Sequence, residues 1–273
     1  MSGRRLAKRA GRSLGLAALA LMAALLVGCA HGGLEGEGEV TLFQVSTIDA
    51  LMDGAYEGQV SLAQLARHGD LGIGTFQGLD GEMVALDGRF YQVKADGRAY
   101  AADPALKTPF ANVVRFAPQR VLALRGTMSL EDLCQAIDQA LPSPNLFYAV
   151  RIDGDFAYLK TRSVPVQHRP YPKLVEVVKQ QSVFQFNQVR GTVLGFRCPA
   201  FVKGVNVPGW HLHFIDQARD AGGHVLGLKV VDPHVQIAVA SRFVMVLPQE
   251  GEFMHSDLAV DRGADLKQVE KGR

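Results

Sequence analysis

Residues Pro208–Val231 read PGWHLHFIDQARDAGGHVLGLKVV. Apolar residues flank His211 and His213, which favours a β-strand, and residues two apart on a strand point to the same face. The polar stretch 216–223 ends in two glycines and predicts a turn, after which His224 opens a second apolar run. In such a hairpin, His224 lies across from the other two histidines at the few-ångström separation of cross-strand neighbours.

Three imidazoles on one strand face suit a zinc ion, which histidine nitrogens bind at about 2.0 to 2.1 Å. This donor set leaves a coordination position for water or substrate, as in catalytic sites, whereas structural sites are usually closed by thiolates. The spacing therefore predicts Zn²⁺ bound by His211, His213 and His224, against the alternative of three histidines that merely lie near a strand edge. The other histidines are expected to be exposed or structurally hydrogen-bonded: His31, His68, His168, His234 and His255.

The first 28 residues have the pattern of an export signal. Five basic residues within the first twelve positions precede an uncharged, small or apolar run from Leu14 to Val27. That run is shorter than the roughly 20 residues of a membrane-spanning helix, which disfavours a transmembrane anchor. The ending Leu26-Val27-Gly28-Cys29 resembles a bacterial lipobox and implies lipidation of Cys29. We expect an exported protein, lipid-anchored at a bacterial membrane or periplasmic or extracellular, with residues 29–40 as a flexible tether.

Charge and cysteine content restrict the partners. The chain has 29 basic and 27 acidic residues, and the predicted signal contains five of the basic and none of the acidic ones, which leaves 24 against 27 and a net charge of −3. This balance gives no support for nucleic-acid binding, in which phosphate contacts dominate. Membrane contact is expected only through Cys29. Cys134 and Cys198 could pair in an oxidising compartment, but two buried free thiols are expected.

Composition and periodicity predict a sheet-rich α+β (mixed α/β) fold with short helices. The 273 residues are 48% hydrophobic, enough for a sizeable core in one or two domains. Strand-like runs prevail in both halves, and few long helical patterns alternate with them, which disfavours a doubly wound parallel sheet.

Local signals predict individual elements. Ser61 is expected to cap a short helix that ends before Gly69, and Ser129 a second helix through a variant of the capping box. The β-rich runs Phe147–Ile152 and Phe156–Val164 flank Asp153-Gly154-Asp155 and predict a hairpin. Val235–Leu247 is apolar and rich in β-branched residues, as in a strand.

Further stretches between about Phe43 and the C-terminal tail form distinctive motifs. They are Val45-Ser46-Thr47-Ile48-Asp49-Ala50-Leu51, Gly72-Ile73-Gly74-Thr75-Phe76, Leu79-Asp80-Gly81-Glu82-Met83, Lys107-Thr108-Pro109-Phe110, Arg151-Ile152-Asp153-Gly154, Lys160-Thr161-Arg162, Tyr171-Pro172, Asn206-Val207-Pro208-Gly209-Trp210-His211-Leu212-His213-Phe214 and Gly222-Gly223-His224-Val225-Leu226. Through these motifs the chain resembles the bacterial α-acetolactate decarboxylase family.

The resemblance implies a carboxy-lyase of acetoin and butanediol biosynthesis that converts 2-acetolactate to acetoin and CO2. It implies Zn²⁺ on the same three histidines, a metal-stabilised enediolate, and a homodimer of two-domain subunits. On this division, residues 41–165 form an N-terminal sheet domain and residues 166–248 a C-terminal metal-binding sheet domain, with the metal site on a β-hairpin. Residues 249–273 form a tail that reaches towards the active site. The polarity of these residues alone would instead predict a frayed C-terminus.

The resemblance also adds four site residues. By motif, Glu82, Arg162 and Glu270 are catalytic, and Thr75 binds substrate. The guanidinium of an arginine suits contact with the substrate carboxylate, and glutamates near a cation suit proton transfer or substrate orientation. Which glutamate moves which proton stays open. Without the resemblance, the pattern around Glu82 fits a solvated residue after a turn, and Arg162 could belong to the charged face of an ordinary hairpin. Arg151 is a competing candidate for the catalytic arginine.

The residues alone are also compatible with two other classes of function. A cupin-like oxygenase or hydrolase would use a similar three-histidine centre with iron or manganese in place of zinc. A non-catalytic exported lipoprotein would capture zinc without turnover. The second alternative predicts His-rich flexible loops, which this sequence lacks.

Overall fold

The computed structural model describes residues 39–271, which belong to one compact unit, Gly38–Arg273. The expected export signal and residues 29–38 of the expected tether lie outside the described residues. Within the described part, no helix has both the length and the apolar composition that crossing a membrane requires.

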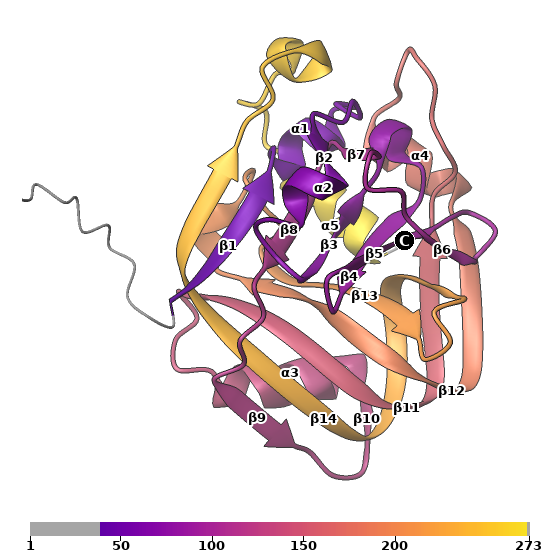
Figure 1. Cartoon of the computed structure of the whole chain (residues 1–273), viewed down its shortest axis with the longest axis vertical. Helices are drawn as coiled ribbons and strands as arrows, with labels where there is room; N and C mark the ends of the chain where they lie inside the picture. Colours follow the sequence, from indigo (N-terminus) through magenta and orange to yellow (C-terminus); the bar gives the residue numbers. More distant parts are fainter. Residues whose placement is uncertain (1–38, 272–273) are drawn as a thin grey trace, which may run out of the picture. The chain divides into compact units, whose positions relative to one another are not determined.

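Strands dominate the fold, as the sequence predicts (Figure 1). Their bounds are β1 (Val40–Val45), β2 (Val60–Ser61), β3 (Leu71–Thr75), β4 (Glu82–Leu86), β5 (Arg89–Val93), β6 (Ala99–Ala101), β7 (Lys107–Thr108), β8 (Ala111–Val114), β9 (Arg120–Ala123), β10 (Thr127–Ser129), β11 (Phe147–Ser163), β12 (Ser182–Cys198), β13 (Gly209–Asp216) and β14 (Gly222–Val246). Twelve of these strands form one mixed sheet, and β2 pairs with β7 separately.

The helices are short and lie outside the sheet (Figure 1). The α-helices are α1 (Ile48–Met52), α2 (Leu62–Leu65), α3 (Leu130–Ala140), α4 (Leu174–Val177) and α5 (Gly263–Lys271). The 3₁₀-helices are η1 (Gln77–Leu79), η2 (Val178–Gln180), η3 (Ala200–Val202) and η4 (Gly251–His255). The coarse prediction of a mixed, sheet-rich fold with few short helices is therefore confirmed.

The sheet joins the two halves of the chain. Its order is β11-β12-β13-β14-β1-β8-β3-β4-β5-β6, and a further β11–β14 pairing closes the four long strands on themselves. The parallel β1–β14 pairing connects this closed part to the N-terminal strands. The division between residues 41–165 and 166–248 is not confirmed, because β11 of the first range is hydrogen-bonded along its length to β12 and β14 of the second.

Both predicted helix starts are confirmed. Ser61 and Ser129 cap α2 and α3, and each takes part in a capping box with the residue three positions later. In α3, Leu133 and Ile137 are fully buried against strands of the closed part of the sheet, in a cluster that includes Tyr148. Capping and burial of one apolar face together explain why this eleven-residue helix forms.

The predicted hairpin about Asp153-Gly154-Asp155 is wrong, because Phe147–Ser163 is one continuous strand. Thr192 donates a 2.7 Å hydrogen bond to the Asp153 carboxylate, so this residue is held in the sheet by its neighbour on β12. Gly154 serves close packing, since a Cβ there would lie 2.8 Å from a methyl carbon of Val230. The glycine thus permits close approach of two strands, a use that the sequence pattern does not distinguish from a turn.

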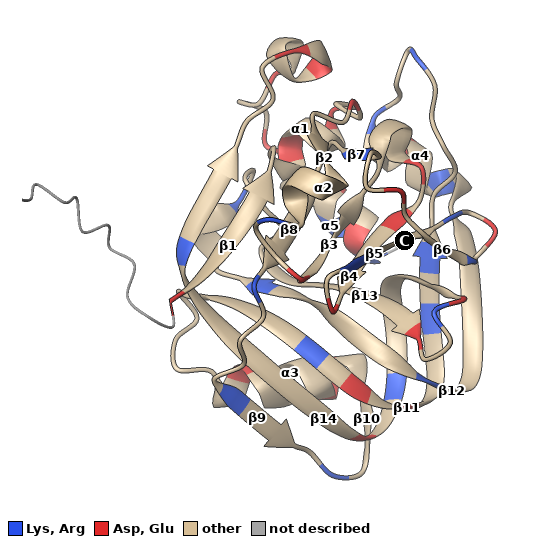
Figure 2. Cartoon of the chain, in the orientation of Figure 1, with Lys and Arg blue, Asp and Glu red and all other residues tan. Residues whose placement is uncertain are grey.

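Charges of both signs are spread over the described residues (Figure 2), and both cysteines of this part of the chain are free thiols. In Figure 2, Lys and Arg are interspersed with Asp and Glu over the strands and loops. Cys134 and Cys198 are free, and Cys198 is buried whereas Cys134 is partly buried. Burial raises the pKa of both thiols to about 12.

Candidate active site

The hairpin of β13 and β14 brings three histidines together. His213 and His224 are direct cross-strand partners, and His211 lies two residues before His213 on the same face. The ring centroids are 5.1 Å apart for His211 and His213, 5.1 Å for His211 and His224, and 5.4 Å for His213 and His224. The rings therefore converge, which is the geometry that the sequence spacing predicts.

The ring nitrogens of this cluster fit a metal ion. Each histidine offers one nitrogen that lies within 4.8 Å of the others, and each has a buried nitrogen with no hydrogen-bond partner: Nδ1 of His211, Nε2 of His213 and Nδ1 of His224. Buried polar atoms are rarely left without a partner, so three such atoms on three neighbouring rings suit the binding of a metal ion. Three neutral imidazoles suit zinc and other divalent transition metals.

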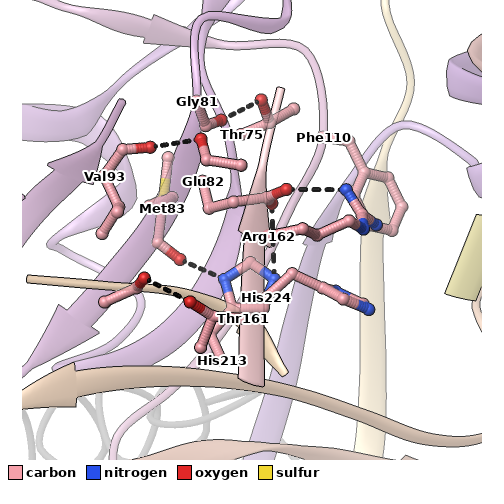
Figure 3. A network of polar contacts seen from close by, with 12 residues as sticks. Thr75, Gly81, Glu82, Met83, Val93, Phe110, Thr161, Arg162, His213 and His224 are labelled. Atoms are coloured by element: carbon pink, nitrogen blue, oxygen red, sulfur yellow. Dashed lines mark hydrogen bonds and ion pairs between the residues drawn. The ribbon is translucent and has the colours of Figure 1, made fainter. Parts of the chain in front are cut away.

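In His213 and His224, a hydrogen bond to a backbone carbonyl determines which ring nitrogen carries the proton. Nδ1 of His213 lies 2.8 Å from the carbonyl oxygen of Met83, and Nε2 of His224 lies 3.2 Å from that of Glu270. A carbonyl oxygen only accepts hydrogen bonds, so these nitrogens donate and the opposite nitrogen keeps its lone pair. Figure 3 shows the first of these contacts at the centre of the site.

Burial keeps the three imidazoles neutral. It lowers the pKa of His211 to about 3 and those of His213 and His224 well below the usual value, and the nearby Arg162 guanidinium lowers all three further. At neutral pH each ring therefore presents a lone pair rather than a proton, as metal binding requires.

Arg162 and Glu82 form a buried ion pair beside the histidines (Figure 3). Nη1 of Arg162 donates to Oε1 of Glu82 at 2.8 Å, and the two side chains are 6% and 8% exposed. Arg162, at the end of β11, is the cross-strand partner of His224, so its side chain lies on the same face as the cluster. Oε2 of Glu82 lies 3.6 Å from Nε2 of His213.

Glu82 is positioned by the start of β4. Its cross-strand partner is Thr75, the last residue of β3, whose hydroxyl donates a 2.7 Å hydrogen bond to the carbonyl of Gly81. Gly81 has φ +84°, and a Cβ there would lie 2.3 Å from the carbonyl oxygen of Val93, so only glycine fits. The Asp-Gly-Glu stretch is thus a turn whose next residue is buried rather than solvated.

Glu270 comes to the site from the C-terminal helix α5, whose Leu266 and Val269 are buried. Oε2 of Glu270 lies 3.9 Å from Nε2 of His224. Burial raises the pKa of Glu270 to about 7, with Arg162 opposing the rise, and burial likewise raises that of Glu82 to about 7 against the effect of Arg162. Each carboxyl can therefore hold a proton near neutral pH.

A cavity brings these groups together with an apolar wall. Its polar lining is Thr75, Glu82, Arg162, His211, His213 and Glu270. Its apolar lining includes Ile48, Leu51, Leu79, Phe110, Val164, Leu174 and Val269. All four site residues carried over by resemblance thus meet two of the three histidines in one space, and His224 adjoins it. The competing Arg151 does not line this cavity and instead pairs with Asp87 and Asp153.

Sequence reasoning missed the apolar wall and the carbonyl of Met83. Ile48 and Phe110 belong to motifs that carry the resemblance, yet nothing in their local pattern separates a pocket wall from an ordinary core. A backbone carbonyl has no residue-type signal, although the position of Met83 directly after Glu82 could have indicated it once β4 was assigned to the site.

Comparison with known proteins agrees with this geometry. A family model described as alpha-acetolactate decarboxylase matches residues 42–260. An alpha-acetolactate decarboxylase of Methanosarcina mazei is 50% identical over 230 residues, which are 84% of this chain and 80% of the relative. One of Bacillus subtilis is 42% identical over 217 residues, 80% of this chain and 85% of the relative.

Solved structures give the same result. The crystal structure of alpha-acetolactate decarboxylase from Bacillus subtilis matches with a TM-score of 0.83 at 40% identity, over 85% of this chain and all of that one. A Staphylococcus aureus protein described as similar to alpha-acetolactate decarboxylase matches with a TM-score of 0.80 at 31% identity, again over 85% and 100%. On the family model, the relatives and the fold together, this chain belongs to the alpha-acetolactate decarboxylase family.

Proposed function

We propose that this protein is a carboxy-lyase that converts 2-acetolactate to acetoin and CO2 at a zinc ion held by His211, His213 and His224. The observation that carries the proposal is the convergence of three buried imidazole nitrogens without partners beside the Arg162–Glu82 pair. When bound there, zinc supplies a Lewis acid for the negative charge that develops on the substrate oxygens as CO2 leaves.

Arg162 is suited to hold the substrate carboxylate. It is the one Lys or Arg among the described residues that line the cavity, and its Nε is buried with no hydrogen-bond partner. Glu82 occupies Nη1, so Nε and the remaining guanidinium hydrogens stay free for an anion. A buried guanidinium keeps its charge, which orients the carboxylate for cleavage of the bond between C1 and C2.

Glu82 and Glu270 are suited to hold and move the proton that the product needs. Cleavage releases CO2 and leaves an electron pair shared between C2 and the neighbouring ketone oxygen, and acetoin forms when C2 takes up one proton. A carboxyl with a pKa of about 7 carries a proton in part of the molecules at neutral pH and can donate it. Thr75, through the carbonyl of Gly81, would keep Glu82 in position.

The apolar wall matches the rest of the substrate. The methyl groups of 2-acetolactate need a surface without hydrogen-bonding groups, and Ile48, Leu51, Phe110 and Leu174 provide it in the same cavity. The site thus offers both charged groups and an aliphatic surface, as this substrate requires.

Turnover of racemic 2-acetolactate tests the proposal. The purified protein should release acetoin and CO2 in equal amounts, lose activity after treatment with a chelator, and recover it with zinc. Metal analysis of the protein as isolated separates zinc from iron or manganese. Tight zinc binding without acetoin formation would contradict the proposal and favour zinc capture.

Location and assembly are separate proposals. Residues 1–29 support export and a lipid anchor at Cys29. Incorporation of a labelled fatty acid that is lost in Cys29→Ala tests the anchor. Family membership supports a homodimer, which sedimentation equilibrium of the protein without its lipid would test.

A further inference from the structure

Arg262, directly before α5, is a buried cation away from the cavity. Its side chain is 6% exposed, and its Nη2 donates a 2.7 Å hydrogen bond to Oδ1 of Asp53, which is 16% exposed. Its Nη1 donates to the carbonyl oxygen of Asp257 at 2.7 Å. Among the described residues, Asp53 is thus the carboxylate that forms a salt bridge with this charge, and the carboxylate of Asp49 lies close enough to interact with it.

This ion pair joins two elements that line the cavity. Asp53 is the C-cap of α1, from which Ile48 and Leu51 form part of the apolar wall. The carbonyl of Arg262 accepts from the amide of Leu266 at 2.9 Å, so Arg262 begins the hydrogen-bonded turn of α5. Glu270 lies eight positions after Arg262, a rise of about 12 Å at 1.5 Å per residue.

A second ion pair of this segment is weaker. Lys203 and Asp261 form an ion pair at 2.7 Å, but their side chains are 58% and 69% exposed. Exposed pairs contribute little to stability, whereas removal of one partner of a buried pair leaves an uncompensated charge and is costly. Apart from the apolar contacts of Leu266 and Val269 and the 3.2 Å contact between Nε2 of His224 and the carbonyl oxygen of Glu270, the start of α5 is therefore held mainly by the pair of Arg262 and Asp53.

We propose that Arg262 is a positioning residue for the reaction, which holds α5 through Asp53 so that the carboxyl group of Glu270 stays in the cavity. The inference rests on the proposed function, in which Glu270 takes part in proton transfer. Arg262 is not among the residues that line the cavity, so it acts indirectly, through the elements that its ion pair joins.

The test compares Arg262→Met with Glu270→Gln in the full-length, zinc-loaded chain. We expect Arg262→Met to lower kcat at least tenfold while the zinc content stays unchanged. Amide hydrogen exchange should become faster in peptides that cover 263–271 and stay unchanged in β13. In the Glu270→Gln background, Arg262→Met should change kcat less than twofold, because the group that Arg262 positions is already disabled.

Matched variants keep the test decisive. Lys203→Met removes the exposed pair on the same segment and should leave kcat within twofold of wild type. Asp53→Asn keeps a hydrogen-bond acceptor but removes the charge, and it should reproduce the effect of Arg262→Met in milder form. This variant replaces Arg262→Met in the test if Arg262→Met does not fold.

Equal losses of kcat from Arg262→Met with and without Glu270→Gln would overturn the proposal, as would unchanged exchange of α5. If Glu270→Gln alone keeps full activity, the proposed role of Glu270 fails. The exchange of residues 263–271 then still decides whether Arg262 holds the helix.

Discussion

Arg162 at the end of β11 and Glu82 at the start of β4 lie 80 residues apart and form an ion pair with 2.8 Å between Nη1 and Oε1, both side chains nearly excluded from water. The pair connects β4 to β11, which is itself paired with β14 of the hairpin that carries the histidines. Such a buried pair is costly to desolvate, so its presence beside a cavity fits function better than stabilisation.

Arg162→Ala should retain zinc and lose most of the rate. The variant removes the cation that we propose holds the substrate carboxylate, and it leaves the ring nitrogens of the histidines in place. We expect kcat/KM for 2-acetolactate to fall at least a hundredfold with zinc content near one per chain. Arg151→Ala, which changes a partly exposed arginine outside the cavity, is the control and should stay within a few-fold of wild type. Retained activity in Arg162→Ala would contradict its role.

His213→Ala should lose both zinc and activity. His213 is 1% exposed and contributes one of three converging nitrogens, so two ligands remain and the affinity for zinc drops. His234→Ala is the matched control, because His234 lies on β14 as His224 does but is exposed and outside the cluster. Zinc content by mass spectrometry and acetoin formation are measured together. A His213→Ala protein that keeps stoichiometric zinc would contradict the proposed ligand set.

The sequence predicted the histidine cluster because strand geometry is local. Alternation along β13 and one turn suffice to bring three side chains together, whatever the rest of the chain does. Thr75, Glu82 and Arg162 came from resemblance alone, since their meeting depends on the order of strands in the sheet, which local pattern does not encode.

One wrong prediction and one unconfirmed prediction have the same physical origin. Gly154 was expected in a turn and lies in a strand, where it allows close approach to Val230. The boundary between residues 165 and 166 was expected between domains, yet β11 pairs with strands on the other side of it. Pairing partners far away in the chain decide both features, so no window of sequence around either position contains the answer.

Glu82→Gln should change how the stability of the metal-free protein depends on pH. The pKa of Glu82 is raised from 4.5 to about 7 by burial, so folding takes up a proton between these values. The contribution of the protonated form to stability is therefore present below pH 4.5 and is lost as the pH rises through 7.

Between pH 5 and 8, the free energy of unfolding of wild type should fall relative to Glu82→Gln by an amount on the order of 2 kcal/mol. Urea denaturation of both chelated proteins at the two pH values measures this difference. The histidines titrate in both proteins, so their opposite contribution cancels. A wild-type protein that gains stability relative to the variant as the pH rises would show that Glu82 is ionised throughout.

Cys134 and Cys198 should resist alkylation in the folded protein. Burial raises the pKa of both thiols from 9.0 to about 12, so at pH 8 only about one in ten thousand is a thiolate. Labelling with iodoacetamide, resolved by peptide mass spectrometry, should be at least a hundredfold slower at both cysteines than in guanidinium chloride. Rapid labelling of Cys198 in the native state would indicate that β12 opens.

Gly195→Ala should move the strand that carries His211. Gly195 on β12 faces Leu212 across the β12–β13 pairing, and a Cβ there would lie 2.1 Å from the carbonyl oxygen of His211. Backbone cannot yield as a flexible side chain would, so β13 must shift away, at a cost of about 1–3 kcal/mol. We expect the midpoint of urea unfolding to fall and the affinity for zinc to drop at least tenfold.

Gly227→Ala on β14 is the matched control for this effect. A Cβ at Gly227 has no atom within 4 Å, so the added methyl group meets open space, and stability and zinc affinity should stay close to wild type. The comparison separates a general effect of alanine in a strand from a displacement of the ligand. If Gly195→Ala loses stability yet binds zinc as wild type does, β13 adjusts without moving His211, and the close approach of β12 supports the sheet rather than the metal site.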